Sequence, residues 1–153
     1  MKETLVKEIR KLITVEPAIV LENDSIQKII DIFIGNPVTR AVYVVDKKDS
    51  FIGIITIQDI LKKISLDSHS LSSLYSSPTF TGYNIALSAK EVTAGDIMDP
   101  EVYFVHDDDP IEEAFNLLFK NNAGEIPVVD ENDKLVGDLN VIELLVLWKQ
   151  NQE

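Results

Sequence analysis

Hydrophobic residues in the first part of the chain fall into two kinds of pattern. Helical spacing from Ile26 to Ile34 follows the capping pair Asp24-Ser25 and stops at Gly35-Asn36-Pro37. A further helix is predicted from Thr56 to about Ile64. Short, nearly continuous apolar runs predict buried strands, at 18–21, 41–45 and 51–55. The pattern therefore predicts a β-α-β-β-α unit.

The same unit occurs again 84 residues later. Between Val42–Leu61 and the matching stretch Ile126–Leu145, six of the 20 aligned pairs are identical. The second unit predicts the same elements in the same order: a strand at 102–105, a helix from 111, strands at 126–129 and 135–139, and a helix to about 148. We therefore expect an α/β protein built from two β-α-β-β-α repeats.

Two segments lie outside these repeats. Leu5, Ile9, Leu12 and Ile13 form one apolar stripe, which predicts an amphipathic helix over residues 1–13. A serine-rich stretch separates the repeats and is expected to connect them. The expected organisation is an N-terminal helix (1–14), repeat 1 (15–64), a Ser-rich connection (65–95) and repeat 2 (96–149).

Composition excludes several classes of function. The net charge of −12 disfavours nucleic acid and anionic membrane surfaces as partners. The 153 residues include no cysteine and only two histidines, which excludes disulfides and thiolate metal sites and disfavours a multi-histidine site. No apolar run reaches the ~20 residues that a membrane span needs. The start of the chain lacks the apolar core of a signal peptide, so we expect a cytoplasmic protein.

The junction between the strand at 51–55 and the next helix carries the sharpest local signal. Thr56 and Asp59 are spaced as a capping box, in which each side chain bonds to a backbone N–H group of the other residue. The same helix start also suits an anion, and a carboxylate one turn in can accept hydrogen bonds from two ribose hydroxyls. In repeat 2 the equivalent residues are Asn140 and Glu143, which preserve a cap but alter a nucleotide site.

Arg40 is a second candidate. The chain has one other arginine, Arg10, and Arg40 precedes a strand in an acidic protein. Its counterpart in repeat 2 is Gly124, followed by Glu125. Arg40 is either an ordinary surface charge or the cation for one anionic ligand bound beside Thr56 and Asp59.

Together these motifs resemble a known family. The spacing Gly53-x-x-Thr56-x-x-Asp59 and the stretch Asp96-Ile97-Met98-Asp99-Pro100 resemble a tandem pair of cystathionine-β-synthase-type (CBS) domains, a Bateman module. Thr39–Asp59 also resembles the first repeat of the gamma regulatory subunit of AMP-activated protein kinase. The resemblance implies two repeats packed about a pseudo-two-fold axis, with a ligand in the cleft between them.

The family resemblance also implies roles for individual residues. Asp59 is expected to contact the ribose, Thr56 to contribute its hydroxyl and Arg40 to contact phosphate; Ile54 and Ile19 complete the expected nucleotide-binding set. The implied ligands are AMP, ADP, ATP or S-adenosylmethionine, with no catalytic cofactor and no metal. The matching positions of repeat 2 hold Gly124, Asn140 and Glu143, which depart from this binding pattern. The resemblance therefore implies a ligand in the cleft beside Thr56 and Asp59 rather than in a second cleft beside Asn140 and Glu143.

Three functions remain open from the sequence. The first is a non-catalytic sensor that regulates an unidentified partner protein, and the second is an interaction module with a vestigial ligand site. The third is a metal-assisted phosphohydrolase using the acidic cluster at 106–109. The helix that ends near Trp148 is apolar on nearly its whole circumference. Either the N-terminal helix or the segment 65–95 covers this surface, or two chains do so in a homodimer, which we expect.

Overall fold

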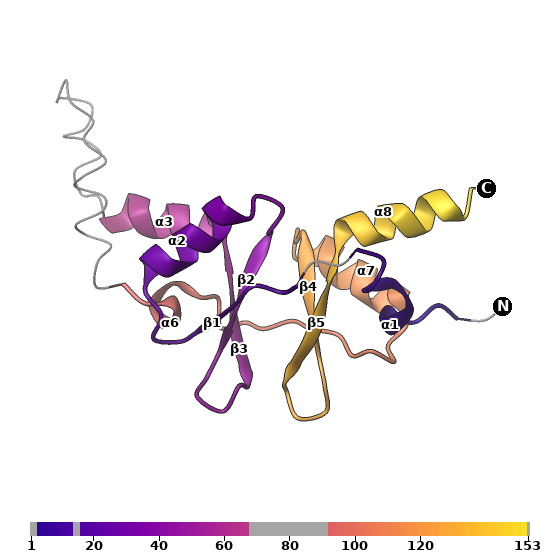
Figure 1. Ribbon diagram of the computed structural model, residues 1–153, viewed down its shortest axis with the longest axis horizontal. Coiled ribbons are helices and arrows are strands. Elements are labelled where there is room, and N and C mark those ends of the chain that lie inside the picture. The colour runs from indigo at the N-terminus through magenta and orange to yellow at the C-terminus, as the bar shows by residue number, and fades with distance from the viewer. Residues whose placement is uncertain (1–2, 14–15, 68–91, 153) are drawn as a thin grey trace, which may run out of the picture.

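The computed structural model describes residues 3–13, 16–67 and 92–152. The helices and strands follow one another as two similar sets (Figure 1). In chain order they are α1 (Val6–Ile9), β1 (Ile19–Leu21), α2 (Ile26–Gly35), β2 (Ala41–Val45), β3 (Phe51–Thr56), α3 (Ile57–Asp67), α6 (Ala94–Ile97), α7 (Ile111–Lys120), β4 (Glu125–Val129), β5 (Leu135–Asn140) and α8 (Val141–Gln150). The expected connection at 65–95 lies mostly outside the described residues.

The first half is a three-stranded sheet with helices packed on it. The strand order is β1-β2-β3, with β1 parallel and β3 antiparallel to β2. Every residue of β2 is buried, as expected for a central strand with an apolar sequence. The Ser25 side chain accepts a hydrogen bond from the backbone N–H of Lys28 at 3.2 Å and caps α2, which then buries Ile26 and Ile29 against the sheet.

The second half repeats this arrangement with one strand fewer. β4 and β5 pair antiparallel, and an irregularity between Val128 and Val129 matches the one between Val44 and Val45 in the first half. The strand expected at 102–105 does not form, and among these residues only Val105 makes a bridge, to Val128. The backbone N–H of Val102 instead bonds to the carbonyl of Pro100 at 2.9 Å, a contact within the segment itself.

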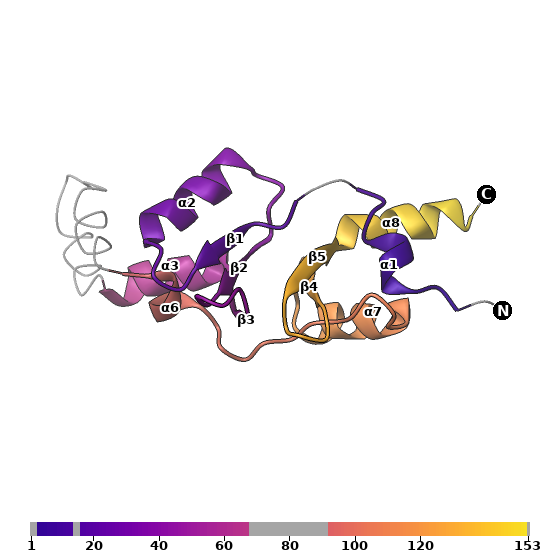
Figure 2. The ribbon, with the colours of Figure 1, turned by 60° about the horizontal axis from the view of Figure 1, so that its bottom comes forward.

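The short helices α1 and α6 are exchanged between the halves. Val6 and Ile9 of α1 are buried in the core of the second half, whereas Ala94 and Ile97 of α6 are buried in the core of the first. Figure 1 shows α1 beside α7 and α8, although it begins the chain, and Figure 2 shows the same grouping from another direction. Each half is therefore completed by a segment from outside its own repeat.

α1 is also much shorter than the helix expected over residues 1–13. The first-turn N–H groups of Val6 and Lys7 bind the carbonyls of Asp109 and Asp107 in the loop before α7. The guanidinium of Arg10 donates two hydrogen bonds to the Asp107 carboxylate, at 2.5 and 2.9 Å. These contacts hold the segment against the second half, and the helix itself ends at Ile9.

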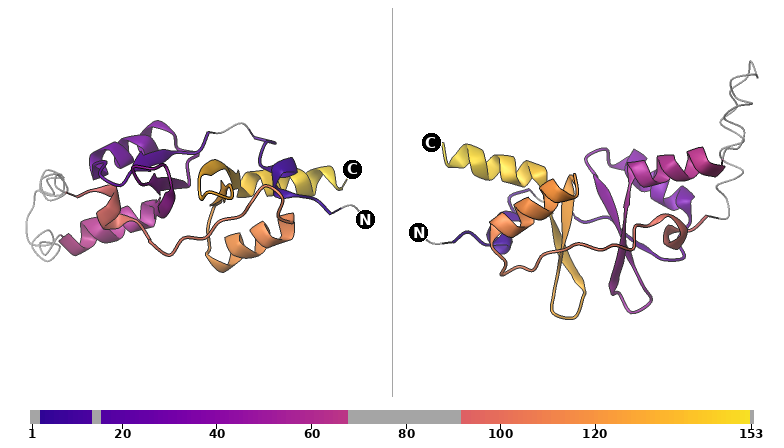
Figure 3. Two further views of the ribbon diagram at one scale, coloured as in Figure 1. Left: turned by 90° about the horizontal axis from the view of Figure 1, so that it is seen from below. Right: turned by 180° about the vertical axis from the view of Figure 1, so that it is seen from behind.

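A third core joins the two halves. Ala41, Tyr43, Phe51 and Ile54 of the first half are buried together with Val129 of the second. Figure 3 shows the β2–β3 and β4–β5 hairpins lying side by side. The turns of the hairpins touch too, because the backbone N–H of Phe51 bonds to the carbonyl of Asp133 at 2.9 Å. At the other end of the hairpins, the start of β2 meets β4, because the backbone N–H groups of Arg40 and Ala41 donate to the carboxylate of Glu125. Among the described residues, no helix is long and apolar enough to cross a membrane.

Candidate ligand cleft

A cleft of about 440 Å³ opens at the junction of the two halves. One wall is formed by the start of β2, the end of β3 and the first turn of α3. The opposite wall consists of residues 121–125, between α7 and β4, together with Asp99 and Tyr103. A molecule bound here touches both repeats at once.

Four of the five residues expected to bind a nucleotide line this cleft: Arg40, Ile54, Thr56 and Asp59. The fifth, Ile19, lies outside it. Ile19 is on β1 and is 44% exposed. Since the strand order is β1-β2-β3, Ile19 is separated by β2 from β3, the strand that carries Ile54 and Thr56.

Thr56 and Asp59 form the capping box that their spacing predicts. One oxygen of Asp59, Oδ2, accepts hydrogen bonds from the backbone N–H and the hydroxyl of Thr56, both at 2.8 Å. The backbone N–H of Asp59 donates to the Thr56 hydroxyl at 3.3 Å. Among the described residues, no group donates to the other oxygen, Oδ1. Capping and ligand binding are therefore compatible, since the cap uses one of the two carboxylate oxygens.

The side chain of Arg40 packs closely against Gly124 of the second half. A Cβ atom on Gly124 would lie 3.0 Å from both Cβ and Cγ of Arg40. The guanidinium is exposed and donates one hydrogen bond, from Nη1 to the carbonyl of Pro37 at 3.2 Å. The absence of a side chain at 124 in repeat 2 thus makes room for the arginine of repeat 1.

Glu125 fixes the backbone on which Arg40 stands. Its carboxylate accepts the backbone N–H groups of Arg40 at 2.9 Å and Ala41 at 3.1 Å, and the side-chain amide of Asn140 at 3.0 Å. Burial raises the pKa of Glu125, an effect that these hydrogen bonds oppose. Sequence reasoning noted Glu125 only as a departure from Arg40 and missed its role in holding the two halves together.

Tyr103 is the other cleft residue that sequence analysis missed. Burial raises the pKa of its phenol, and so do the negative charges of Asp99, Asp59 and Glu125. These three carboxylates line the same cleft as the Tyr103 side chain. An aromatic ring beside hydrogen-bonding groups suits a flat heterocycle.

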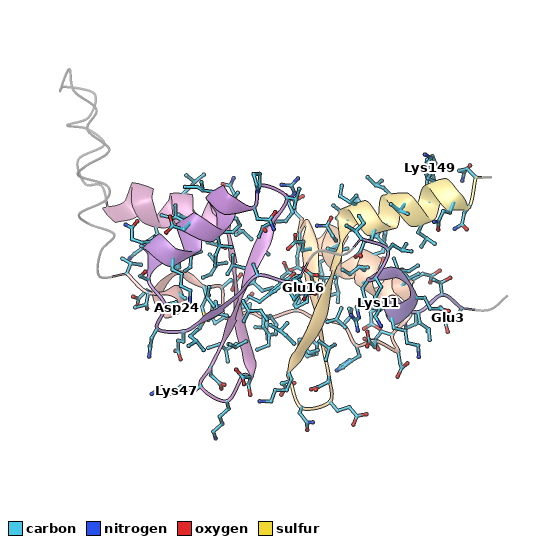
Figure 4. All side chains as sticks on the ribbon, in the orientation of Figure 1. Glu3, Lys11, Glu16, Asp24, Lys47 and Lys149 are labelled. Carbon is cyan, nitrogen blue, oxygen red and sulfur yellow. The ribbon has the colours of Figure 1, made fainter. Side chains whose placement is uncertain are left out.

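The equivalent position in repeat 2 is already occupied by the chain itself. Glu143 is 2% exposed; its Oε2 accepts the backbone N–H of Asn140 at 3.0 Å, and its Oε1 accepts that of Ile13 at 3.2 Å. Burial and the charges of Glu125 and Glu143 raise the pKa of neighbouring Asp138 to about 7. Figure 4 shows Glu16, which helps to line a small pocket next to Asp138, near the junction of the halves.

The acidic cluster at 106–109 is engaged with the chain's own groups. Asp107 binds Arg10, Asp108 accepts from Lys7 at 2.5 Å, and Oδ2 of Asp109 accepts the backbone N–H of His106 at 2.6 Å. Among the described residues, no group of three or more acidic or histidine side chains is arranged to hold a metal ion.

Comparison with known proteins identifies the family. The sequence matches the CBS domain over residues 6–66 and 94–147. The chain belongs to the CBS domain family. Its fold is α/β with two CBS repeats, each resembling β-α-β-β-α, and the tandem pair is a Bateman module. The matches begin at α1 and α6, the two exchanged helices.

Three relatives are informative for this CBS pair. A CBS domain-containing protein from Thermotoga maritima is 37% identical, with a TM-score of 0.74 and 97% of each chain covered. The Methanocaldococcus jannaschii protein MJ1426 is 28% identical, covering 93% of this chain and 91% of its own. The CBS domain pair of protein MJ0100, solved with 5′-methylthioadenosine and S-adenosylmethionine, is 26% identical with a TM-score of 0.69, covering 95% of this chain and 99% of its own.

Proposed function

We propose that this CBS pair is a non-catalytic regulatory module that binds an adenosine ligand in the cleft beside Asp59. AMP, ADP, ATP and S-adenosylmethionine are the candidate ligands. Two neighbouring groups carry the proposal. In the first turn of α3, Asp59 has one carboxylate oxygen that receives no hydrogen bond from the described residues. The exposed side chain of Arg40 lines the same cleft. A ribose and an attached phosphate need this pair of groups. Binding of adenosine compounds by the MJ0100 pair supports the proposal.

Regulation follows from the position of the cleft. The ligand contacts Thr56 and Asp59 on one side and residues 121–125 on the other, so its binding energy depends on how the two repeats are oriented. A ligand that binds one orientation more tightly shifts the population towards it. An unidentified partner protein that contacts both repeats then receives the signal.

Thermal unfolding with a panel of adenosine compounds tests this function. A ligand that binds only the folded state at about 100 times its Kd stabilises the protein by roughly 2.7 kcal/mol. AMP, ADP, ATP and S-adenosylmethionine are each added at millimolar concentration, with GMP and CMP as controls. A melting temperature that stays constant with all four adenosine compounds contradicts the proposal.

An interaction module with a vestigial ligand site is the second candidate. The observation in its favour is that Leu61 of α3 and Leu145 of α8 are 51% and 60% exposed at equivalent positions of the two repeats. Unchanged melting temperatures with every ligand, together with self-association through these helices, favour this candidate over the first.

A further inference from the structure

The ligand cleft contains more negative than positive side chains. Its charged lining residues are the carboxylates of Asp59, Asp99 and Glu125 and the cations of Arg40 and Lys62. Asp59 and Arg40 are the groups that the proposed function uses. Asp99 and Glu125 are additional, and a site for polyphosphates gains nothing from either of them.

Asp99 is held in this position by the first half. Its backbone pairs with Ile54 of β3 through two hydrogen bonds: the N–H of Asp99 to the carbonyl of Ile54 at 2.8 Å, and the N–H of Ile54 to the carbonyl of Asp99 at 3.2 Å. Oδ1 of Asp99 accepts the backbone N–H of Glu101 at 2.9 Å, which fixes the side chain. Asp99 is exposed, and it lines the cleft.

The three carboxylates face the same volume. Asp99, Asp59 and Glu125 all line the cleft beside Tyr103, and their negative charges raise the pKa of its phenol. Glu125 is buried and bonded to the backbone of Arg40 and Ala41, so it cannot turn away when an anion enters.

We infer that this cleft selects adenosine ligands by charge, accepting adenosine and its monophosphate and rejecting the triphosphate, with Asp99 as the specificity-determining residue. The inference rests on the proposed function. Arg40 matches the first phosphate, but each further phosphate adds about one negative charge to a cleft whose lining has three carboxylates and, with Lys62, two cations. Repulsion of a wrong ligand is as effective a source of specificity as attraction of the right one.

Calorimetry with adenosine, AMP, ADP and ATP tests the inference. The titrations use low ionic strength, so that salt does not screen the charges, and EDTA, so that ATP is free of divalent cations. We expect the wild-type protein to bind AMP at least about tenfold more tightly than ATP. The Asp99→Asn variant keeps an oxygen that can accept the hydrogen bond from the backbone N–H of Glu101. We expect this variant to reduce the ratio of AMP affinity to ATP affinity by about fivefold.

Glu101→Gln is the matched control. It removes the same charge two residues away, from an exposed side chain that does not line the cleft, and should change the ratio by less than about twofold. ATP binding as tight as AMP binding in the wild type, or an unchanged ratio in Asp99→Asn, overturns the inference but leaves an adenosine site in place. If none of the four compounds binds, the proposed function fails and the charge selection fails with it.

Discussion

The backbone N–H of Ile13 donates a hydrogen bond to Oε1 of Glu143 at 3.2 Å. In the first repeat the residue equivalent to Glu143 is Asp59, whose Oδ1 has no donor among the described residues. The N-terminal segment therefore supplies to the second cleft the kind of donor that a ribose hydroxyl would supply to the first. We expect one adenosine ligand per chain, which the stoichiometry of a calorimetric titration measures.

Replacing the carboxylate of Asp59 should separate binding from stability. We expect Asp59→Ala to weaken the binding of an adenosine ligand by on the order of tenfold to a thousandfold, because charge-assisted hydrogen bonds to the ribose are lost. Glu143→Ala should change the affinity little. Affinity is measured by calorimetry and stability by thermal unfolding.

The chain contains a matched control for the cap of Asp59. Asp96 caps α6 with the same geometry. Its Oδ2 accepts hydrogen bonds from the backbone N–H of Thr93 at 2.9 Å and from the Thr93 hydroxyl at 3.0 Å. Asp96→Ala should cost about 1 kcal/mol of stability and leave affinity unchanged. Equal losses of affinity in the Asp59 and Glu143 variants would mean that the second cleft also binds ligand.

Arg40 should distinguish ligands with a phosphate from those without one. Because its guanidinium is exposed and acts on charge, we expect Arg40→Ala to weaken AMP binding by about tenfold and to leave adenosine binding nearly unchanged. Lys47→Ala is the control, since Lys47 lies at the tip of the β2–β3 hairpin, away from the cleft (Figure 4). Equal losses for AMP and adenosine would assign Arg40 a structural role.

Much of this arrangement follows from local sequence signals. The apolar runs that became β2 and β3, and the Thr56–Asp59 spacing, specify their structures through neighbouring residues alone. The internal repeat then predicted the hairpin of β4 and β5 and the altered cap at Asn140, which the structure also contains.

The opposite wall of the cleft could not be predicted in this way. Tyr103 and Glu125 reach Asp59 and Arg40 only because the hairpins pack together, and no local pattern specifies that contact. The same reason explains the missing strand at 102–105, where burial depends on a neighbouring sheet rather than on the apolar character of the residues.

Stability should fall as the pH rises from about 4 to about 7. Burial and the charges of Glu125 and Glu143 raise the pKa of Asp138 to about 7, from about 3.9 in the unfolded chain. Its favourable contribution is complete below the unfolded value and is lost as the pH passes the folded value. The loss amounts to at most about 4 kcal/mol. Tyr43 and Arg10 face the same group and oppose this shift.

Asp138→Asn tests the origin of this pH dependence. The variant should melt at a higher temperature than the wild type at pH 8 and show a flatter dependence of melting temperature on pH. Asp107 serves as the control, because its hydrogen bond with Arg10 lowers its pKa, the opposite direction to Asp138. Asp107→Asn should therefore destabilise the protein at both pH 5 and pH 8. A wild-type protein that becomes more stable between pH 5 and 8 would contradict the assignment.

Exposed apolar residues on α3 and α8 should form a homodimer contact. We expect a species of about 34 kDa, twice the 17.2 kDa chain, in sedimentation experiments. Leu145→Glu should shift it towards monomer, whereas Leu21→Glu, on β1, should not. Leu147 is less suitable for this test, since it packs against the core of the second half. A sharp 17.2 kDa monomer at high micromolar wild-type concentration would exclude the dimer.

The exchange of α1 and α6 determines how the protein can be divided. A fragment covering only the first repeat lacks Ala94 and Ile97, and one covering only the second lacks Val6 and Ile9, so neither contiguous piece contains all the buried residues of its own core. The two repeats should therefore unfold in one cooperative transition. The smallest portion of this chain that can be transferred intact to another protein is the whole pair.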